Sequence, residues 1–195
     1  MNRPFPLLLS ELLSGDANRF EKPPFFFVFD VESIGLHGEA FAFGISVLDQ
    51  EGVEHSSYLY ACPPDLAAGS EEDRDWCRAN IPEIQPNVKD PWNLRIEFLR
   101  LWFCWAKRGA VMAADCAWPV EARFLCDVFG AEPYLKFSGP YPLIDIGSVL
   151  MAKGINPTAS FTRLPSELPE HNPLADARQS GRVLLNLLSI PRQPA

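Results

Sequence analysis

The sequence predicts an α/β sandwich with a mixed sheet. Three strand-like segments come first, over residues 25–29, 40–48 and 53–60, and a turn that ends in Gly52 joins the last two. Helix-like and strand-like segments then alternate along the chain. A hairpin of leading strands followed by this alternation is typical of an α/β sandwich.

The first of these segments is the strongest strand signal. Residues 25–29 read Phe-Phe-Phe-Val-Phe and follow Pro23 and Pro24. A continuous aromatic and β-branched run predicts a strand that is buried on both faces, in the middle of a sheet. The segments 40–48 and 53–60 flank the sequence Asp-Gln-Glu-Gly, which indicates a hairpin.

The rest of the chain predicts helices separated by short apolar segments. The apolar residues 110–114 predict a short strand, and Asp145 is a suitable N-cap after Leu143 and Ile144. Proline favours the first helical position and glycine the position after the end, so Pro119 and Gly130 bracket one helix. The helices are expected over residues 71–79, 92–107, 119–129, 145–153 and from about 173 onward. The last helix is expected to place Ala177, Gly181, Leu184 and Leu188 on one face.

Length and composition fit one globular domain. The chain has 195 residues, 47% of them hydrophobic, and we expect a core over about 23–189, an N-terminal extension with a short helix (1–22) and a frayed tail (190–195). No uncharged apolar run approaches the roughly 18–20 residues that span a bilayer. The leucine-rich N-terminus is interrupted by Glu11 and lacks a signal-peptide cleavage site. We therefore expect a soluble, cytoplasmic protein without membrane contact.

The net charge and the cysteine content argue against some classes of nucleic-acid-binding and metal-binding protein. A net charge of −8 argues against a protein that coats nucleic acid through bulk charge. It does not argue against an enzyme that meets phosphates through bound metal ions, because those ions supply the local positive charge. The five cysteines are widely spaced and form no C-x-x-C pair, so we expect reduced thiols rather than disulfides or a zinc site.

Two carboxylates close the predicted central strand. Because side chains alternate along a strand, Asp30 and Glu32 project to one face and Val31 to the other. Adjacent carboxylates repel each other, and Mg²⁺, which takes oxygen ligands, is their natural partner. The alternative is a pair that faces solvent where the strand ends, and the D-x-E pattern alone favours that simpler explanation.

A second chemical signal lies near the C-terminus. His171 precedes a predicted helix with Asn172 as N-cap and Pro173 at its first position, and Asp176 falls within the first turn. Taken singly, Asp176 is explained by the helix dipole and His171 by an inconsequential loop position. A strand-end D-x-E together with H-x-x-x-x-D-A is far more specific than either pattern alone.

This combination resembles the DEDDh 3′–5′ exonucleases, the RNase T-like group, over about residues 25–188. Residues 29–36 resemble the first motif, D-x-E-T-x-G-L, with Ser33 in place of threonine. Residues 171–177 resemble the third motif, H-x-A-x-x-D-A, with proline in place of the small residue. Trp76, Arg78 and Pro82 are similar to a helix of the single-domain bacterial members. The resemblance implies a ribonuclease H-like three-layer sandwich with a central mixed five-stranded sheet.

The second motif of the family, H-N-x-x-F-D-x-x-F-L, is matched less well. Counting back from Phe124, Glu121 stands at the position of its aspartate, with a side chain one methylene longer. Asp115 has the usual carboxylate but lies six residues earlier, at the end of the short strand. Glu121 is slightly favoured for the motif position, Asp115 is expected near the site in either case, and the choice stays open at this point.

The resemblance also implies a mechanism. Asp30, Glu32 and Asp176, with Glu121 or Asp115, would bind two Mg²⁺ or Mn²⁺ ions about 4 Å apart. His171 would be the general base for the attacking water, since a histidine has an unperturbed pKa of about 6.5. The substrate would be a single-stranded RNA or DNA 3′ end, and the product a nucleoside 5′-monophosphate. A mobile, proline-rich loop over 156–170 would bring His171 to the site when substrate binds.

The substrate contacts that follow from the resemblance are fewer. Leu36 resembles an apolar wedge against the terminal base, and Ser33 lies beside it in the first motif. From residue type alone, Trp118 and Phe161 could stack on bases and Arg163 could touch a phosphate, but ordinary surface aromatics and a solvated charge are the simpler explanations. Family members often pair, so a homodimer is compatible with the resemblance. Two other functions stay open: a catalytically weak or inactive nucleic-acid-binding or scaffold module of the same fold, and a phosphodiesterase restricted to dinucleotides.

Overall fold

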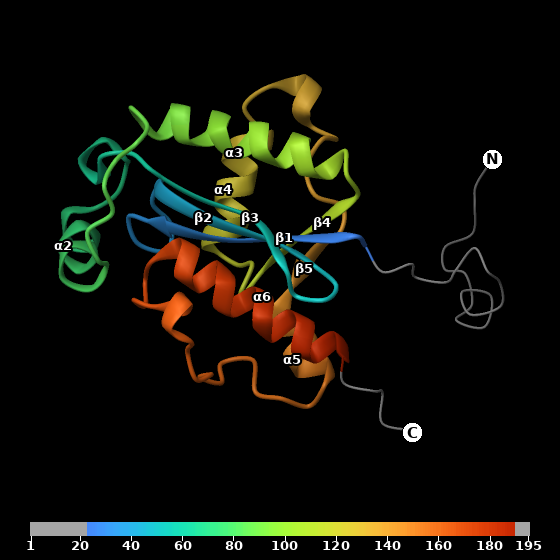
Figure 1. Cartoon of the computed structure of the whole chain (residues 1–195). Helices are drawn as coiled ribbons and strands as arrows, with labels where there is room; N and C mark the ends of the chain where they lie inside the picture. The colour runs from blue at the N-terminus through green and yellow to red at the C-terminus, as the bar shows by residue number, and fades with distance from the viewer. Residues whose placement is uncertain (1–22, 190–195) are drawn as a thin grey trace, which may run out of the picture.

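The computed structural model describes residues 23–189, so the expected N-terminal helix and frayed C-terminal tail lie outside the described residues. A five-stranded sheet forms the centre, in the order β3-β2-β1-β4-β5 (Figure 1). β1 pairs antiparallel with β2 and β2 with β3, whereas β1 with β4 and β4 with β5 are parallel. The expected mixed five-stranded sheet is therefore confirmed.

The strands follow the predicted segments closely. They are β1 (Phe25–Ser33), β2 (Ala40–Asp49), β3 (Glu54–Ala61), β4 (Ala110–Ala114) and β5 (Leu143–Asp145). β1 is central, as its aromatic run predicts, and its side chains alternate between two apolar clusters. Phe27 and Phe29 belong to one cluster with Phe98 and Phe124, and Val28 belongs to the other.

Helices cover both faces of the sheet (Figure 1). α3 (Pro91–Ala106) and α4 (Val120–Phe129) lie on one face, α5 (Ile146–Ala152) and α6 (Pro173–Ser189) lie on the other, and α2 (Glu71–Asn80) lies at one end. Short 3-10 turns complete the connections at residues 64–66, 133–135 and 165–167. This is the expected three-layer sandwich.

Several helix ends differ from the predictions by one residue. Pro119 is the N-cap of α4 rather than its first residue. In the last turn of α6 Leu187 is buried, at 3% exposure, whereas Leu188, on the same helix face as Leu184, is 37% exposed. The five cysteines are free thiols, as expected. Within residues 23–189 no helix combines the length and the apolar character needed to cross a bilayer.

One feature of the sheet positions the site. β4 pairs with β1 from Phe25 to Val28, while β2 stays paired with β1 as far as Ser33. The last part of β1 therefore lacks β4 as a neighbour, and the chain leaves β4 at its carboxyl end. In open α/β sheets, ligands bind at the carboxyl ends of the strands, in the crevice between two neighbouring strands whose connections go to opposite sides of the sheet. Asp30 and Glu32 lie in this stretch.

Candidate active site

The first two carboxylates lie at the end of β1. Glu32 is 9% exposed, and Asp30 is half-buried beneath the start of α6. Burial raises the pKa of Asp30 well above its usual value, and repulsion from Glu121, Glu32, Asp176 and Asp115 adds to the shift. Burial likewise raises the pKa of Glu32 to about 8, with Asp176 and Glu121 adding to it. A solvent-facing pair would show neither burial nor such crowding, so the simpler explanation of this pair does not hold.

The start of α6 lies directly on the sheet. A Cβ atom at Gly44 of β2 would stand 2.1 Å from the backbone nitrogen of Leu174, so glycine permits the close approach. The Asn172 side chain accepts hydrogen bonds from the Leu174 and Ala175 amides at 3.1 and 3.2 Å, which confirms the predicted N-cap. Asp176 then follows in the first turn, above β1.

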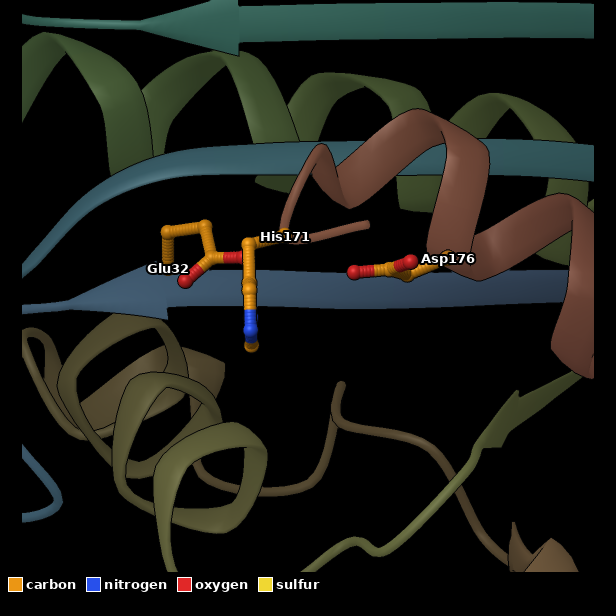
Figure 2. Close-up of side chains that lie close together, drawn as sticks. All are labelled: Glu32, His171 and Asp176. Carbon is orange, nitrogen blue, oxygen red and sulfur yellow. The ribbon is translucent and has the colours of Figure 1, made fainter. Parts of the chain in front are cut away.

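His171 joins the carboxylates at this point. Its φ of 59° lies in the left-handed region, which turns the chain sharply into α6. Possible ligand atoms of Glu32, His171 and Asp176 all lie within 4.8 Å of one another. Figure 2 shows the His171 side chain between Glu32, on β1, and Asp176, on α6. The structure thus places His171 beside the carboxylates.

Trp76 of α2 touches His171. The two ring centroids are 5.8 Å apart and the ring planes are at 82°, an edge-to-face contact. The sequence marked Trp76 through the family resemblance but gave it no role at the site. Its contact with His171 joins residues 95 positions apart and could not be read from local spacing.

Glu121 and Asp115 approach from the side of α4 and β4. Glu121 is 8% exposed in the first turn of α4, and burial raises its pKa to about 7, although backbone amides of Glu121 and Val31 oppose the shift. The Val31 amide belongs to the part of β1 that β4 leaves unpaired. Asp115 follows β4, and burial raises its pKa, with Asp145 and Asp176 adding and Arg163 opposing. Both residues thus belong to the cluster.

The cluster has the donor set of a divalent-cation site. Burial raises the pKa of five carboxyl groups, those of Asp30, Glu32, Asp115, Glu121 and Asp176. Carboxylate oxygens are the preferred ligands of Mg²⁺ and Mn²⁺, and a bound cation would relieve their mutual repulsion. The residues therefore fit such an ion.

Two cavities flank the carboxylates. One of about 350 Å³ opens beside Glu32 and is lined by Val31, Glu32, Ser33, Gly35, Leu36, Asp73, Trp76 and Val120. Leu36 is 64% exposed there, an apolar side chain available to a ligand. The other cavity, of about 250 Å³, is lined by residues that include Asp115, Phe161, Arg163, Glu170 and Gln179. Trp118 is 72% exposed next to α4 and lines neither cavity.

Three further residues that the sequence predicts as substrate contacts, Ser33, Phe161 and Arg163, all have partners within the chain. The Ser33 hydroxyl donates to the carbonyl of Gly35 at 2.7 Å and shapes the turn after β1. Phe161 packs partly against the apolar cluster under α5 and α6 and lines the second cavity. Arg163 forms an ion pair with Asp176, at 2.5 Å between Nη1 and Oδ1.

Comparison with known proteins supports the fold. No family model and no curated protein matches the sequence. Among solved structures, the chain is similar to a 3′-exonuclease described in 3′-end-specific recognition of a histone mRNA stem-loop, with a TM-score of 0.53 and 13% identity over 87% of this chain and 83% of that one. It is also similar to a full-length 3′-exonuclease, with a TM-score of 0.51 and 10% identity over 86% of this chain and 61% of that one. The expected ribonuclease H-like fold is thereby confirmed.

Proposed function

We propose that this chain is a metal-dependent 3′–5′ exonuclease of the DEDDh type that removes nucleoside 5′-monophosphates from single-stranded or 3′-overhanging RNA or DNA. One observation carries the proposal. Glu32 of β1 and Asp176 of α6 converge with His171, and Asp30, Glu121 and Asp115 lie near enough to interact electrostatically, in the fold of known 3′-exonucleases. A buried cluster of like charges is costly to the fold, so it calls for a ligand that uses it.

The acidic residues would hold the metal. Asp30, Glu32 and Asp176 would be joined by Glu121 or Asp115 as ligands of two Mg²⁺ or Mn²⁺ ions. When bound, such ions supply Lewis-acid activation and clamp the attacking and leaving oxygens of a phosphodiester. The chain's own part is to hold four carboxylates on rigid elements at one end of β1, where a nucleotide's phosphate can approach.

His171 is suited to the role of general base. It lies within 4.8 Å of Glu32 and Asp176 atoms, and its ring is oriented by Trp76. In this role it takes the proton of the attacking water while the 3′-oxygen of the next nucleotide leaves. The Leu36–Trp76 cavity, about 350 Å³ in volume, offers an apolar wall for the terminal base.

The substrate class is argued from charge and from the neighbours. The sequence has a net charge of −8 and contains no run of basic residues, so we favour short or frayed 3′ ends over long duplexes. One neighbour recognises the 3′ end of an RNA stem-loop, which makes RNA the first substrate to test.

A labelled-oligonucleotide assay tests the proposal. Single-stranded RNA and DNA carrying a 5′ label are incubated with the protein and Mg²⁺ or Mn²⁺, and products are resolved by length. We expect a ladder that shortens from the 3′ end, release of nucleoside 5′-monophosphates, and no cleavage with a chelator. Asp30→Asn is the matched inactive control, because it removes one charge and keeps the side-chain shape.

The same assay separates the alternatives. Cleavage of dinucleotides without cleavage of longer strands would identify a dinucleotide phosphodiesterase. Binding of a 3′ end without turnover, in the presence of either metal, would contradict the nuclease and identify a binding or scaffold module.

A further inference from the structure

Arg163 lies inside the acidic cluster, although the proposed reaction gives it no part in holding metal or moving protons. Its Nη1 atom is 2.5 Å from Asp176 Oδ1, and its Nε atom is 3.4 Å from Glu170. The Arg163 side chain is 18% exposed and that of Asp176 is 16% exposed. A half-buried arginine paired with one of the expected metal ligands needs an explanation.

The loop that carries Arg163 is braced, so the pair is not an accident of a loose surface side chain. Arg163 Nη1 donates to the Glu167 carbonyl at 2.9 Å. The Glu167 carboxylate, 2% exposed, accepts from Arg182 of α6 at 2.6 and 2.8 Å. Arg182 also donates to the Thr162 carbonyl at 2.7 Å. These bonds fix the guanidinium of Arg163 in front of Asp176.

Arg163 and a divalent ion would need the same carboxylate. Asp176 is one of the three residues whose ligand atoms converge within 4.8 Å, and it is also the main partner of Arg163. Two cations next to one carboxylate repel each other strongly when water is partly excluded. We propose, on the basis of the nuclease function argued above, that Arg163 is a built-in counter-ion that competes with the metal for Asp176 and, once displaced, binds the phosphate of the nucleotide.

The surroundings give the displaced guanidinium a place to go. The cavity of about 250 Å³ that Arg163 lines also has Asp115, Glu170 and Gln179 in its wall. Glu170 is 68% exposed and can keep one ion pair with Arg163 outside the metal site. The planar guanidinium matches a phosphate in two hydrogen bonds, which makes arginine the better choice than lysine here. The same side chain thus neutralises the cluster before the metal binds and the substrate afterwards.

Metal titration tests the competition. Free Mn²⁺ is followed by electron paramagnetic resonance as it is added to the parent protein, to Arg163→Gln and to Arg178→Gln. Arg178 is a matched control, because it lies on the same helix as Asp176 but pairs with Glu54 at 2.9 Å. We expect Arg163→Gln to bind Mn²⁺ about tenfold more tightly than the parent and Arg178→Gln to bind it unchanged.

Nucleotide binding tests the proposed contact between Arg163 and the phosphate. At saturating Mn²⁺, adenosine 5′-monophosphate should bind Arg163→Gln about tenfold more weakly than the parent. Arg163→Lys keeps the charge, so its Mn²⁺ affinity should stay close to that of the parent, while its nucleotide affinity falls because one flat pair of hydrogen bonds is lost. Thermal unfolding of each variant shows that the comparison is made on folded protein.

The outcomes are distinct. Mn²⁺ binding that is weaker or unchanged in Arg163→Gln would overturn the competition and make Arg163 a residue that orients Asp176. Unchanged nucleotide affinity would overturn the phosphate contact. A parent protein that takes up no Mn²⁺ would instead contradict the proposed function itself.

Discussion

Glu121 and Asp115 bring two carboxylates of different length to one cluster. Glu121 is the neighbour whose charge contributes most to the raised pKa of Asp30, and it is held by the amide of Val31, on the strand that carries Asp30. Of the four carboxylates that raise the pKa of Asp30 by repulsion, Asp115 contributes least. We therefore propose Glu121 as the fourth ligand.

We predict that Glu121→Gln weakens Mn²⁺ binding by at least about 100-fold and that Asp115→Asn weakens it by less than about tenfold. Isothermal titration with Mn²⁺ measures both. Because Glu121→Gln removes one of several crowded charges, the metal-free variant should unfold at the same temperature as the parent or higher. Weaker Mn²⁺ binding would then not be due to a loss of folding. A larger loss in Asp115→Asn would reverse the assignment.

One substitution distinguishes two possible roles of His171, general base and metal ligand. Asparagine tolerates the left-handed backbone better than most residues, so His171→Asn suits the φ of 59°. We predict that kcat falls by about 10²- to 10⁴-fold while Mn²⁺ affinity changes by only a few-fold. Single-turnover cleavage at saturating Mn²⁺ gives kcat, and titration gives the affinity. A parallel collapse of metal affinity would make His171 a ligand.

The packing of α6 on β2 sets the position of Asp176, because Asp176 lies in the first turn of α6. A Cβ atom at Gly44 would stand 2.1 Å from Leu174 N and Pro173 C, both backbone atoms that cannot rotate away. Gly44→Ala must therefore push β2 and the start of α6 apart, and Asp176 moves with the helix. We predict a loss of about 1–3 kcal/mol in the free energy of unfolding and a larger proportional loss of activity.

Urea unfolding and the cleavage assay measure the two effects in the Gly44 variant. Gly147→Ala is the matched control, since its Cβ atom would meet Asp115 O at an ordinary 3.5 Å. This control should keep both stability and activity. Equal behaviour of the two variants would mean that α6 is not held by Gly44.

The elements that follow from local pattern could be predicted, because their signals lie within a few residues. The aromatic run at 25–29 predicted the central strand, and Asn172 and Pro173 predicted the start of α6. The same motifs marked Asp30, Glu32, His171 and Asp176, which the structure brings to one place. The exposure of Leu188 could not be predicted from its spacing, because burial in the last turn of a helix depends on what packs there.

Contacts between distant segments could not be predicted from spacing. The Arg163–Asp176 pair crosses a loop, and the Trp76–His171 contact joins α2 to α6. β4 stops pairing with β1 after Val28, and no local pattern in either strand marks this point. The motifs therefore identify the acidic residues, but the contacts that set their charge environment come only from the tertiary fold.

The whole molecule concentrates buried negative charge at one end of the sheet. A carboxyl group with a raised folded-state pKa contributes stability below its unfolded pKa, and that contribution is lost as pH rises through the folded value. For Glu32 the range runs from 4.5 to about 8, and for Glu121 from 4.5 to about 7. The metal-free protein should therefore lose stability as pH rises across these ranges.

Metal should reverse this trend, because a divalent ion binds the ionised carboxylates and stabilises the native state by mass action. We predict that the unfolding temperature in chelator falls between about pH 5 and pH 8, whereas the gain on adding saturating Mg²⁺ increases over the same range. Differential scanning fluorimetry across pH, with and without Mg²⁺, measures both curves. A double variant, Asp30→Asn with Glu32→Gln, should reduce the pH dependence of both curves, since it removes two of the crowded groups.

An increase in unfolding temperature on adding Mg²⁺ that is constant with pH would show that the ion binds away from these carboxylates. The cluster would then need another ligand to account for its burial.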